Sequence, residues 1–467
     1  MKRVLLMVVL IASVARAAGA APATMRVDYY HTGNATEERF SLDRIVVEPL
    51  PWPGNPTQPL DGTDRGKYLF EVVDAATGKV LYSRGFASIY GEWETTAEAK
   101  AMHRTFSESF RFPIVDKPAR VVVKKRDAKN VFRDAWTFAI DPANKFVERG
   151  AVSADAGGLI TLHESGDPAT KLDLLILGDG YTRAERRKFE RDARRLVAAL
   201  FATSPFKERR RDINVWGLSP ASPQSGVNRP SQGLFKRTPV GTTYDAFDSE
   251  RYVLTFENRA FRDIASNAPY DVVEILVNSA TYGGGGIYGL YGTVAADSVW
   301  APYIFVHEFG HHLAALADEY YTSDVAYLPA TERIEPWEPN VTALLDPATL
   351  KWKDLIPAGT PLPTAWPKEA FEQYSRDIQR RRREIRAANR PESEMDALFR
   401  EEHAHEKALL GGSPNATRVG AFEGANYEAR GFFRPEVDCI MFTRSNTGTF
   451  CAVCRRAIQA ILDLYSR

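Results

Sequence analysis

Residues 307–321 read HEFGHHLAALADEYY. His307 and His311 are four residues apart, so on a helix their imidazoles lie on one face and can bind a single metal ion. Glu308 lies three residues before His311, near enough to reach a metal-activated water without binding the metal itself. Pro302 suits the first turn of such a helix, where a missing N–H costs nothing. The segment therefore predicts a zinc-binding helix with Glu308 as a general base.

A catalytic zinc needs a third protein ligand, and the helix alone does not supply it. In the pattern H-E-x-x-H-x-x-G-x-x-H, a glycine turn returns a third histidine to the metal, but here Ala314 and Ala317 hold those two positions. Asp318 follows at once. If the helix continued, seven residues of about 1.5 Å rise would place Asp318 roughly 10 Å beyond His311. Either the helix ends near residues 313–315 and the chain turns back, or the ligand comes from elsewhere; no glycine or proline marks such an end.

The segment before this helix is typical of an α/β layer. LDLLILGDGY (172–181) reads as a buried strand ending in a glycine turn, and residues 182–202 follow as an amphipathic helix. Further strands are expected at 212–218 and 271–279, so strands alternate with helices. GGGGIYGLY (283–291) reads as a flexible loop, or as a strand that something approaches closely.

The regions on either side differ from this layer. Residues 24–150 hold short alternating strands, such as YLFEVVD (68–74), between turn-rich segments, which predicts a β-sandwich accessory domain. Residues 323–415 are polar and charged, helical by composition in their second half, and read as an insertion. The predicted fold is multidomain: an N-terminal β-sandwich, then an α/β (α+β) catalytic domain over 165–467 with a helical insertion.

Composition and the N-terminal residues bear on the partners and the location expected for the protein. Lys+Arg and Asp+Glu number 60 each in 467 residues, so no overall charge favours nucleic acid. Residues 1–20, MKRVLLMVVLIASVARAAGA, have the basic start, short apolar run and small residues of a cleaved signal peptide. That run is too short to span a bilayer, and no later segment is expected to cross one. We expect a secreted or periplasmic protein.

All three cysteines lie near the C-terminus: Cys439, Cys451 and Cys454. In an exported protein a disulfide is favoured over a thiolate metal site, because we find no further ligands in the sequence for a zinc knuckle. The expectation is a disulfide of Cys439 with Cys451 or Cys454, and the sequence does not choose between them.

The chain resembles the IgA-peptidase family of zinc metallopeptidases. The resemblance begins at HEFGHHLAALADEYY and extends over nearly the whole chain after residue 20. Other matching segments are VDYYHTG, SRGFASIYGEW, LDLLILGDGYT, INVWGLSPASPQSGV, EPNVT, LKWKDLI, GTPLPT and EGANYEARGFFRPEVDCIMF. It implies a metzincin-like catalytic domain in which an aspartate replaces the third histidine.

Residue roles follow from this resemblance. It implies Zn²⁺ as cofactor, with Asp318 as third ligand; the alternative is that Asp318 or Glu319 only orients a histidine. It also implies that Met441 lies in a tight turn beneath the metal, as an apolar floor. Tyr427 and Arg434 are candidate contacts to the substrate or its oxyanion.

The predicted activity is hydrolysis of peptide bonds in extracellular proteins, with a protein or peptide as substrate. One alternative is a zinc amidase acting on cell-wall or glycoprotein substrates. Another is a non-catalytic exported binding protein, against which the intact base Glu308 argues. The sequence fixes neither the physiological substrate nor the oligomeric state.

Overall fold

The computed structural model describes residues 21–150, 154–329, 332–444 and 448–466. The signal peptide predicted at 1–20 lies outside the described residues. The N-terminal region is all-β apart from two short helices, as predicted. Its strands are β1 Ala23–Gly33, β2 Glu38–Pro51, β3 Tyr68–Asp74, β4 Val80–Phe86, β5 Arg104–Pro113, β6 Ala119–Arg126, β7 Phe132–Ile140 and β8 Val147–Arg149.

These strands form two four-stranded sheets, in the orders β5-β1-β2-β8 and β4-β3-β6-β7. Their alternating apolar residues fill one shared core. Val27 of β1 and Phe112 of β5 come from the first sheet, and Val72 of β3 and Val121 of β6 come from the second. Each sheet thus buries one face against the other, which explains the period-two pattern in the sequence.

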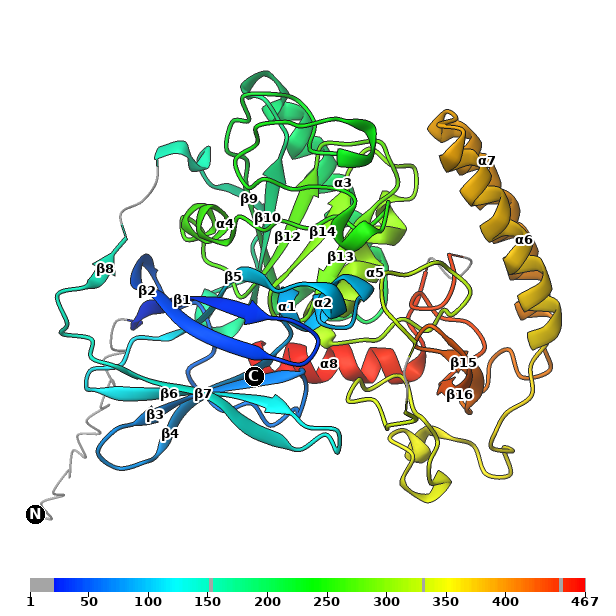
Figure 1. Ribbon diagram of the computed structural model, residues 1–467, viewed down its shortest axis with the longest axis horizontal. Helices are drawn as coiled ribbons and strands as arrows, with labels where there is room; N and C mark the ends of the chain where they lie inside the picture. Colours follow the sequence, from blue (N-terminus) through cyan, green and yellow to red (C-terminus); the bar gives the residue numbers. More distant parts are fainter. Residues whose placement is uncertain (1–20, 151–153, 330–331, 445–447, 467) are drawn as a thin grey trace, which may run out of the picture.

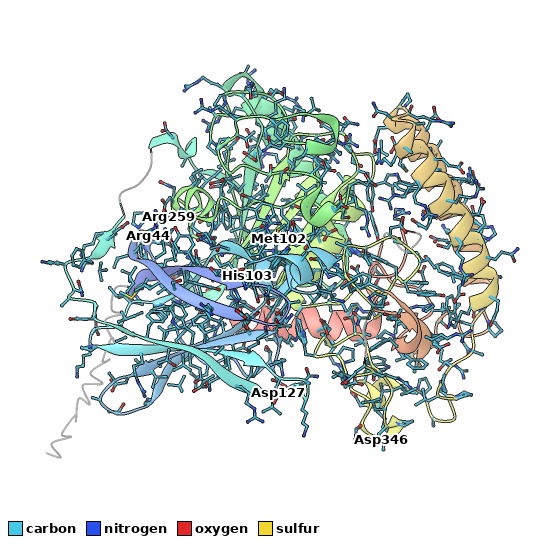
Figure 2. All side chains as sticks on the ribbon, viewed as in Figure 1. Arg44, Met102, His103, Asp127, Arg259 and Asp346 are labelled. Atoms are coloured by element: carbon cyan, nitrogen blue, oxygen red, sulfur yellow. The ribbon has the colours of Figure 1, made fainter. Side chains whose placement is uncertain are left out.

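The helices α1 Ile89–Trp93 and α2 Ala97–Ala101 lie between β4 and β5. Their apolar residues share a core with the second domain, and this core includes both Trp93 and Val273. Charged pairs add to the contact: Arg44 of β2 donates to Asp263 at 2.8 Å, and Arg259 pairs with Asp43. Figure 2 labels Arg44 and Arg259 on either side of this contact. The N-terminal region is therefore docked along the second domain rather than tethered to it (Figure 1).

The second domain is built on a six-stranded sheet of order β13-β14-β12-β10-β11-β9. Its strands are β9 Ile160–His163, β10 Leu172–Asp179, β11 Ile213–Leu218, β12 Val272–Val277, β13 Gly284–Ile287 and β14 Tyr291–Ala295. The four inner strands are parallel, and β9 and β13 run antiparallel at the two edges. Every residue of β10 is buried, as expected for a central parallel strand covered on both faces.

Helices cover both faces of this sheet. α3 Arg186–Ala202, α5 Ala301–Ala314 and α8 Ala452–Ser466 share one core, and α4 Asn258–Ala265 lies on the other face with α1 and α2. A short hairpin, β15 Phe422–Ala425 and β16 Glu428–Arg434, precedes α8. Together these elements form the mixed α/β domain that the sequence predicts.

The charged stretch between α5 and β15 ends in two long helices, α6 Lys368–Ala387 and α7 Glu392–Gly411. They pack against each other and stand at the edge of the molecule away from the N-terminal sheets (Figure 1). Pro391 precedes α7 directly and separates the two helices. Of the residues described, none belongs to a helix both long and apolar enough to cross a membrane.

Candidate metal centre

Helix α5 carries the histidine motif and ends at Ala314, within the interval where an end was needed. The next residue, Ala315, adopts the left-handed conformation with φ 55° and ψ 36°, and its N–H donates to the His311 carbonyl at 3.0 Å. This is the αL type of helix end, which glycine usually forms because a Cβ is disfavoured there. The chain therefore turns back after α5, although the sequence has no glycine at this turn.

The turn brings Asp318 to the two histidines. Its Oδ1 lies 3.1 Å from His307 Nε2 and 3.2 Å from His311 Nε2, and the two Nε2 atoms are 3.1 Å apart. The three atoms thus form a nearly equilateral triangle. For ligands at about 2.05 Å from a tetrahedral zinc, the ligand–ligand separation is about 3.3 Å. The separations fit a zinc ion bound by these three side chains.

The protonation of both histidines also suits a cation. His307 Nδ1 donates to the Ile440 carbonyl at 3.0 Å, and His311 Nδ1 donates to the Leu316 carbonyl. A carbonyl oxygen only accepts, so each Nδ1 carries the ring proton and each Nε2 turns a lone pair to the centre. Among the described residues Asp318 Oδ1 has no hydrogen-bond partner, so it adds a third buried acceptor to the same point.

Electrostatics at the centre follow from this crowding of acceptors. Burial lowers the pKa of His311, but the Asp318 carboxylate outweighs burial and raises it to about 9. Burial raises the pKa of Asp318, yet the two histidines hold it well below its usual range. The raised pKa of His311 and the lowered pKa of Asp318 share one cause, the attraction between a positively charged ring and this carboxylate. A divalent cation would supply the same positive charge.

The general-base candidate Glu308 follows His307 in α5 and lines the adjoining cavity together with both histidines. Burial raises the pKa of Glu308, and the Asp318 charge adds to this, while His307 and His311 act in the opposite direction. A carboxylate with a raised pKa takes up a proton more readily near neutral pH.

Two sets of hydrogen bonds hold the segment that follows α5 and carries Asp318. Asn340 makes the first set: its Oδ1 accepts from the Ala317 N–H at 2.8 Å, and its Nδ2 donates to the Ala317 carbonyl at 2.9 Å. The β15–β16 hairpin supplies the second contact. Asn426 and Tyr427 both have positive φ between Ala425 and Glu428, as in a type I′ turn.

This turn binds the segment through backbone and side chain. The Asn426 N–H donates to the Asp318 carbonyl at 3.0 Å, and the Tyr427 N–H donates to the Tyr320 carbonyl at 3.1 Å. The Tyr427 hydroxyl donates to Asp318 Oδ2 at 2.6 Å. Tyr427 therefore orients Asp318; it also lines the cavity, and its contact with a substrate stays a prediction.

Met441 lies beneath α5 and is fully buried. A Cβ built on Gly310, between the two histidines, would be 3.1 Å from the Met441 sulfur, so sulfur and helix are in direct contact. The preceding residue, Ile440, provides the carbonyl that holds His307. Met441 therefore packs against α5 between the two histidines, and its role as a floor for the metal stays a prediction.

Arg434, the second predicted substrate contact, does not line the cavity. It is fully buried, donates to the carbonyls of Gly424 and Val437, and lies against the rings of Trp366 and Phe442. Burial lowers its pKa to about 10. Position and contacts make Arg434 part of the core below the hairpin.

The predicted disulfide is not formed in this structure, in which all three cysteines are free and buried. Cys439 Sγ lies 3.9 Å from Cys454 Sγ, far beyond the bond length of about 2.05 Å. A fourth side chain, Glu319, lies beside the cysteines, and the sequence did not associate it with them.

The metal centre opens into a cavity of about 520 Å³. Its walls include side chains that sequence reasoning did not single out, and several come from the N-terminal region. They are Lys67, Glu92, Thr95, Arg251, Tyr252, Tyr320, Tyr327 and Trp337. Helix α1 thus forms part of the wall, although residues 24–150 hold no catalytic pattern of their own. Distant segments meet here, so no local sequence signal marks these residues.

Comparison with known families agrees with this geometry. The family model described as IgA Peptidase M64 matches residues 160–462, more than half of the chain, and the model described as Peptidase M64 N-terminus matches residues 19–137. No curated protein matches the chain significantly. The chain, with its histidine–aspartate triangle at the wall of an open cavity, belongs to the IgA peptidase M64 family of metallopeptidases and is a peptide-bond hydrolase.

Proposed function

We propose that this chain is a zinc-dependent endopeptidase in which His307, His311 and Asp318 hold the metal and Glu308 is the general base. One observation carries the proposal: three buried acceptor atoms, each 3.1–3.2 Å from the other two, meet at the wall of the cavity that Glu308 also lines. The donor set of two neutral imidazoles and one carboxylate is typical of catalytic zinc sites.

A zinc bound here would polarise the scissile carbonyl and make the attacking water more acidic. Glu308 accepts the proton of that water as its oxygen attacks the carbonyl carbon. The same carboxyl then donates the proton to the leaving nitrogen, so that Glu308 returns to its starting state. Its raised pKa favours both transfers near neutral pH.

Strand β13 is the candidate platform for an extended substrate. The N–H of Gly284 donates to the Arg251 carbonyl and its carbonyl accepts from Val253, both on the edge away from β14. Two residues further on, the polar groups of Gly286 face the same edge, because backbone groups of residues i and i+2 point the same way. Gly286 lines the cavity, so it can pair with the main chain of a peptide.

Tyr320 is the group best placed to contact the substrate carbonyl oxygen. Its hydroxyl accepts from Arg251 at 3.0 Å, which leaves the phenolic proton free to be donated. Both residues line the cavity beside Glu308, and the Tyr320 ring lies parallel to that of His307 at 6.3 Å. Tyr320 is thus a further candidate for this contact beside Tyr427, which lines the same cavity.

The proposal extends to the type of catalytic domain, the location of the protein and the insertion. The helix end at Ala315, the returning Asp318 and the buried Met441 together support a metzincin-like catalytic domain. The signal-like residues 1–20 support action outside the cytoplasm on extracellular proteins. Residues 323–415 read as an insertion whose helices α6 and α7 do not line the main cavity.

The test compares wild type with Glu308→Gln on an unfolded, unmodified protein substrate. We expect cleavage to fall by about 10²–10⁴-fold while the zinc content stays at the wild-type level. Glu369→Gln, at the exposed start of α6, is the control and should leave the rate unchanged. A Glu308→Gln variant that cleaves at the wild-type rate would contradict the assignment. A wild type that cleaves only glycan-linked or cell-wall amides would instead favour the amidase alternative.

A further inference from the structure

Directly after Asp318, the chain contributes to a second cluster of metal-ligand side chains. Glu319, Cys439, Cys451 and Cys454 are all buried, and their carboxylate and sulfur atoms lie within 4.8 Å of one another. The four residues come from three separate segments: the strand-like return after α5, the turn that holds Met441, and the start of α8. The fold therefore brings them together over more than a hundred residues of sequence.

The separations match tetrahedral coordination. With zinc–sulfur bonds of about 2.3 Å, two thiolates of one tetrahedron lie about 3.8 Å apart, and a thiolate and a carboxylate oxygen lie about 3.6 Å apart. Cys439 Sγ and Cys454 Sγ are 3.9 Å apart, and Cys454 Sγ is 3.4 Å from Glu319 Oε1. These two sulfurs are too distant for a disulfide bond, and their separation is the one expected for two thiolates of a single tetrahedral zinc ion.

Backbone donors point at the sulfurs as they do around bound thiolates. The Cys451 N–H lies 3.2 Å from Cys439 Sγ, and the Cys454 N–H lies 3.4 Å from Cys451 Sγ. Cys451 and Cys454 form a C-x-x-C step into the first turn of α8, the spacing by which one chain segment binds a metal twice. The N-terminus of this fifteen-residue helix also favours negative charge at the sulfurs.

Glu319 supplies an independent sign of a missing cation. Its side chain is fully buried, and Oε1 accepts from Asn340 Nδ2 at 2.9 Å. Oε2 has no hydrogen-bond partner among the described residues, and within that part of the chain no lysine or arginine forms an ion pair with this carboxylate. A buried carboxylate left in this state is costly unless it takes up a proton or a cation is bound to it.

We propose that Glu319, Cys439, Cys451 and Cys454 form a second, structural metal site that binds zinc through three thiolates and one carboxylate. Four protein ligands close the coordination sphere, so no position remains for substrate, as in structural zinc sites generally. Soft thiolate ligands select zinc over magnesium or calcium. The site does not depend on the peptidase proposal, because none of its ligands belongs to the first centre.

The site would fasten the catalytic ligands to the C-terminal helix. Glu319 is covalently next to Asp318, and its N–H donates to the Met441 carbonyl at 2.9 Å. Cys439 lies two residues before Met441 in the turn whose Ile440 carbonyl holds His307. A metal here would therefore fix both the third ligand and the floor of the first centre.

Cobalt is the probe that separates the two sites, because only a thiolate-bound Co²⁺ gives sulfur-to-metal charge-transfer absorption in the near ultraviolet. The full chain is produced in cobalt medium as wild type, as His307→Ala/His311→Ala, and as Cys454→Ser. We expect the band in wild type and in the double histidine variant, and its loss in Cys454→Ser. In zinc medium, wild type should hold about two zinc ions per chain and the double histidine variant about one.

Thiol titration of the denatured wild type in chelator completes the test and needs no variant to fold. Three reactive thiols are expected, and protection of all three in the native zinc-loaded protein. A single reactive thiol would show a disulfide and overturn the proposal. So would a cobalt-loaded wild type without the charge-transfer band, or a double histidine variant that binds no zinc while remaining folded. A wild type that shows the cobalt band but cleaves no peptide would contradict the peptidase proposal and support this second site.

Discussion

The Tyr427 hydroxyl donates a 2.6 Å hydrogen bond to Oδ2 of Asp318, while Oδ1 of the same carboxylate faces His307 and His311. One oxygen is thus held by the protein and the other is left for a metal. Outer hydrogen bonds of this kind fix the direction of a ligand and commonly change metal affinity by 10–100-fold.

Tyr427→Phe should therefore weaken zinc binding at the first centre by about 10–100-fold without unfolding the protein. The measurement is a zinc titration against a competing chelator. Tyr181→Phe is the matched control, because it removes a similar hydrogen bond to Asp192 at 3.0 Å, far from both candidate centres. Equal zinc affinity in Tyr427→Phe and wild type would show that Asp318 needs no such support.

Ala315→Gly should leave the protein at least as stable as wild type. An L-residue in the left-handed conformation is disfavoured by about 1 kcal/mol, which glycine avoids, although the change also removes a buried methyl group. Ala193→Gly, inside helix α3 and equally buried, should instead lower the free energy of unfolding by about 1 kcal/mol or more. Thermal unfolding compares the two variants; a similar drop in midpoint for both would contradict the assigned strain at Ala315.

Gly286→Ala should damage both stability and catalysis. The new Cβ would lie 2.4 Å from the Glu308 carbonyl oxygen and 3.0 Å from the His311 Cβ, so β13 and α5 would have to separate. Overpacking of this kind costs about 1–3 kcal/mol. The control is Gly62→Ala, where a Cβ meets nothing within 4 Å. Proteolytic rate and unfolding midpoint are both measured, and a fully active Gly286→Ala protein would exclude the close packing described.

A pH-dependent contribution to stability is expected from His31 in the N-terminal core. Its ring is fully buried, with Nε2 2.7 Å from Glu38 and Nδ1 3.0 Å from Glu108. Burial lowers the pKa of His31, but the two carboxylates outweigh burial and raise it above the ordinary value. Stabilisation by the charged ring is therefore fully present below about pH 6.5 and is lost as pH rises through the raised pKa.

The check is chemical unfolding of wild type and His31→Gln between about pH 6 and pH 9. At the lower pH the variant should be less stable by about 2 kcal/mol, and the difference should narrow as the pH rises. His103→Gln serves as control, because His103, labelled in Figure 2, is an exposed residue 3.5 Å from Glu37. If the difference in stability between wild type and His31→Gln grew as the pH rose, the charged ring would not be the stabilising form.

The sequence predicted those parts of the molecule that depend on local periodicity. The spacing of His307, Glu308 and His311 needs only a helix, and the all-β and α/β regions follow from patterns of period two and from alternating elements. The resemblance, rather than the spacing, pointed to Asp318. Its approach requires a left-handed alanine, and alanine carries no sequence signal for that conformation.

Contacts between distant segments explain what was missed. Asn340 and Tyr427 support the ligand segment from 22 and 109 residues away from Asp318, by polar contacts that no periodicity marks. The cysteines were expected to pair with each other because Glu319, more than a hundred residues earlier, was not recognised as their neighbour. The arginine at 434 is charged yet fully buried, against the usual preference of its residue type.

Arg65 of the N-terminal region reaches the far end of the motif helix. Its guanidinium donates to the Ala314 carbonyl at 3.0 Å and to the Ala457 carbonyl of α8 at 2.8 Å. Together with helix α1 at the cavity wall, this contact makes the N-terminal region part of the structure that supports the metal centre. A shortened protein starting near residue 160 would expose that helix end and open one side of the cleft. We therefore expect the two halves to be inherited together, and gene shuffling that separates them to yield inactive products.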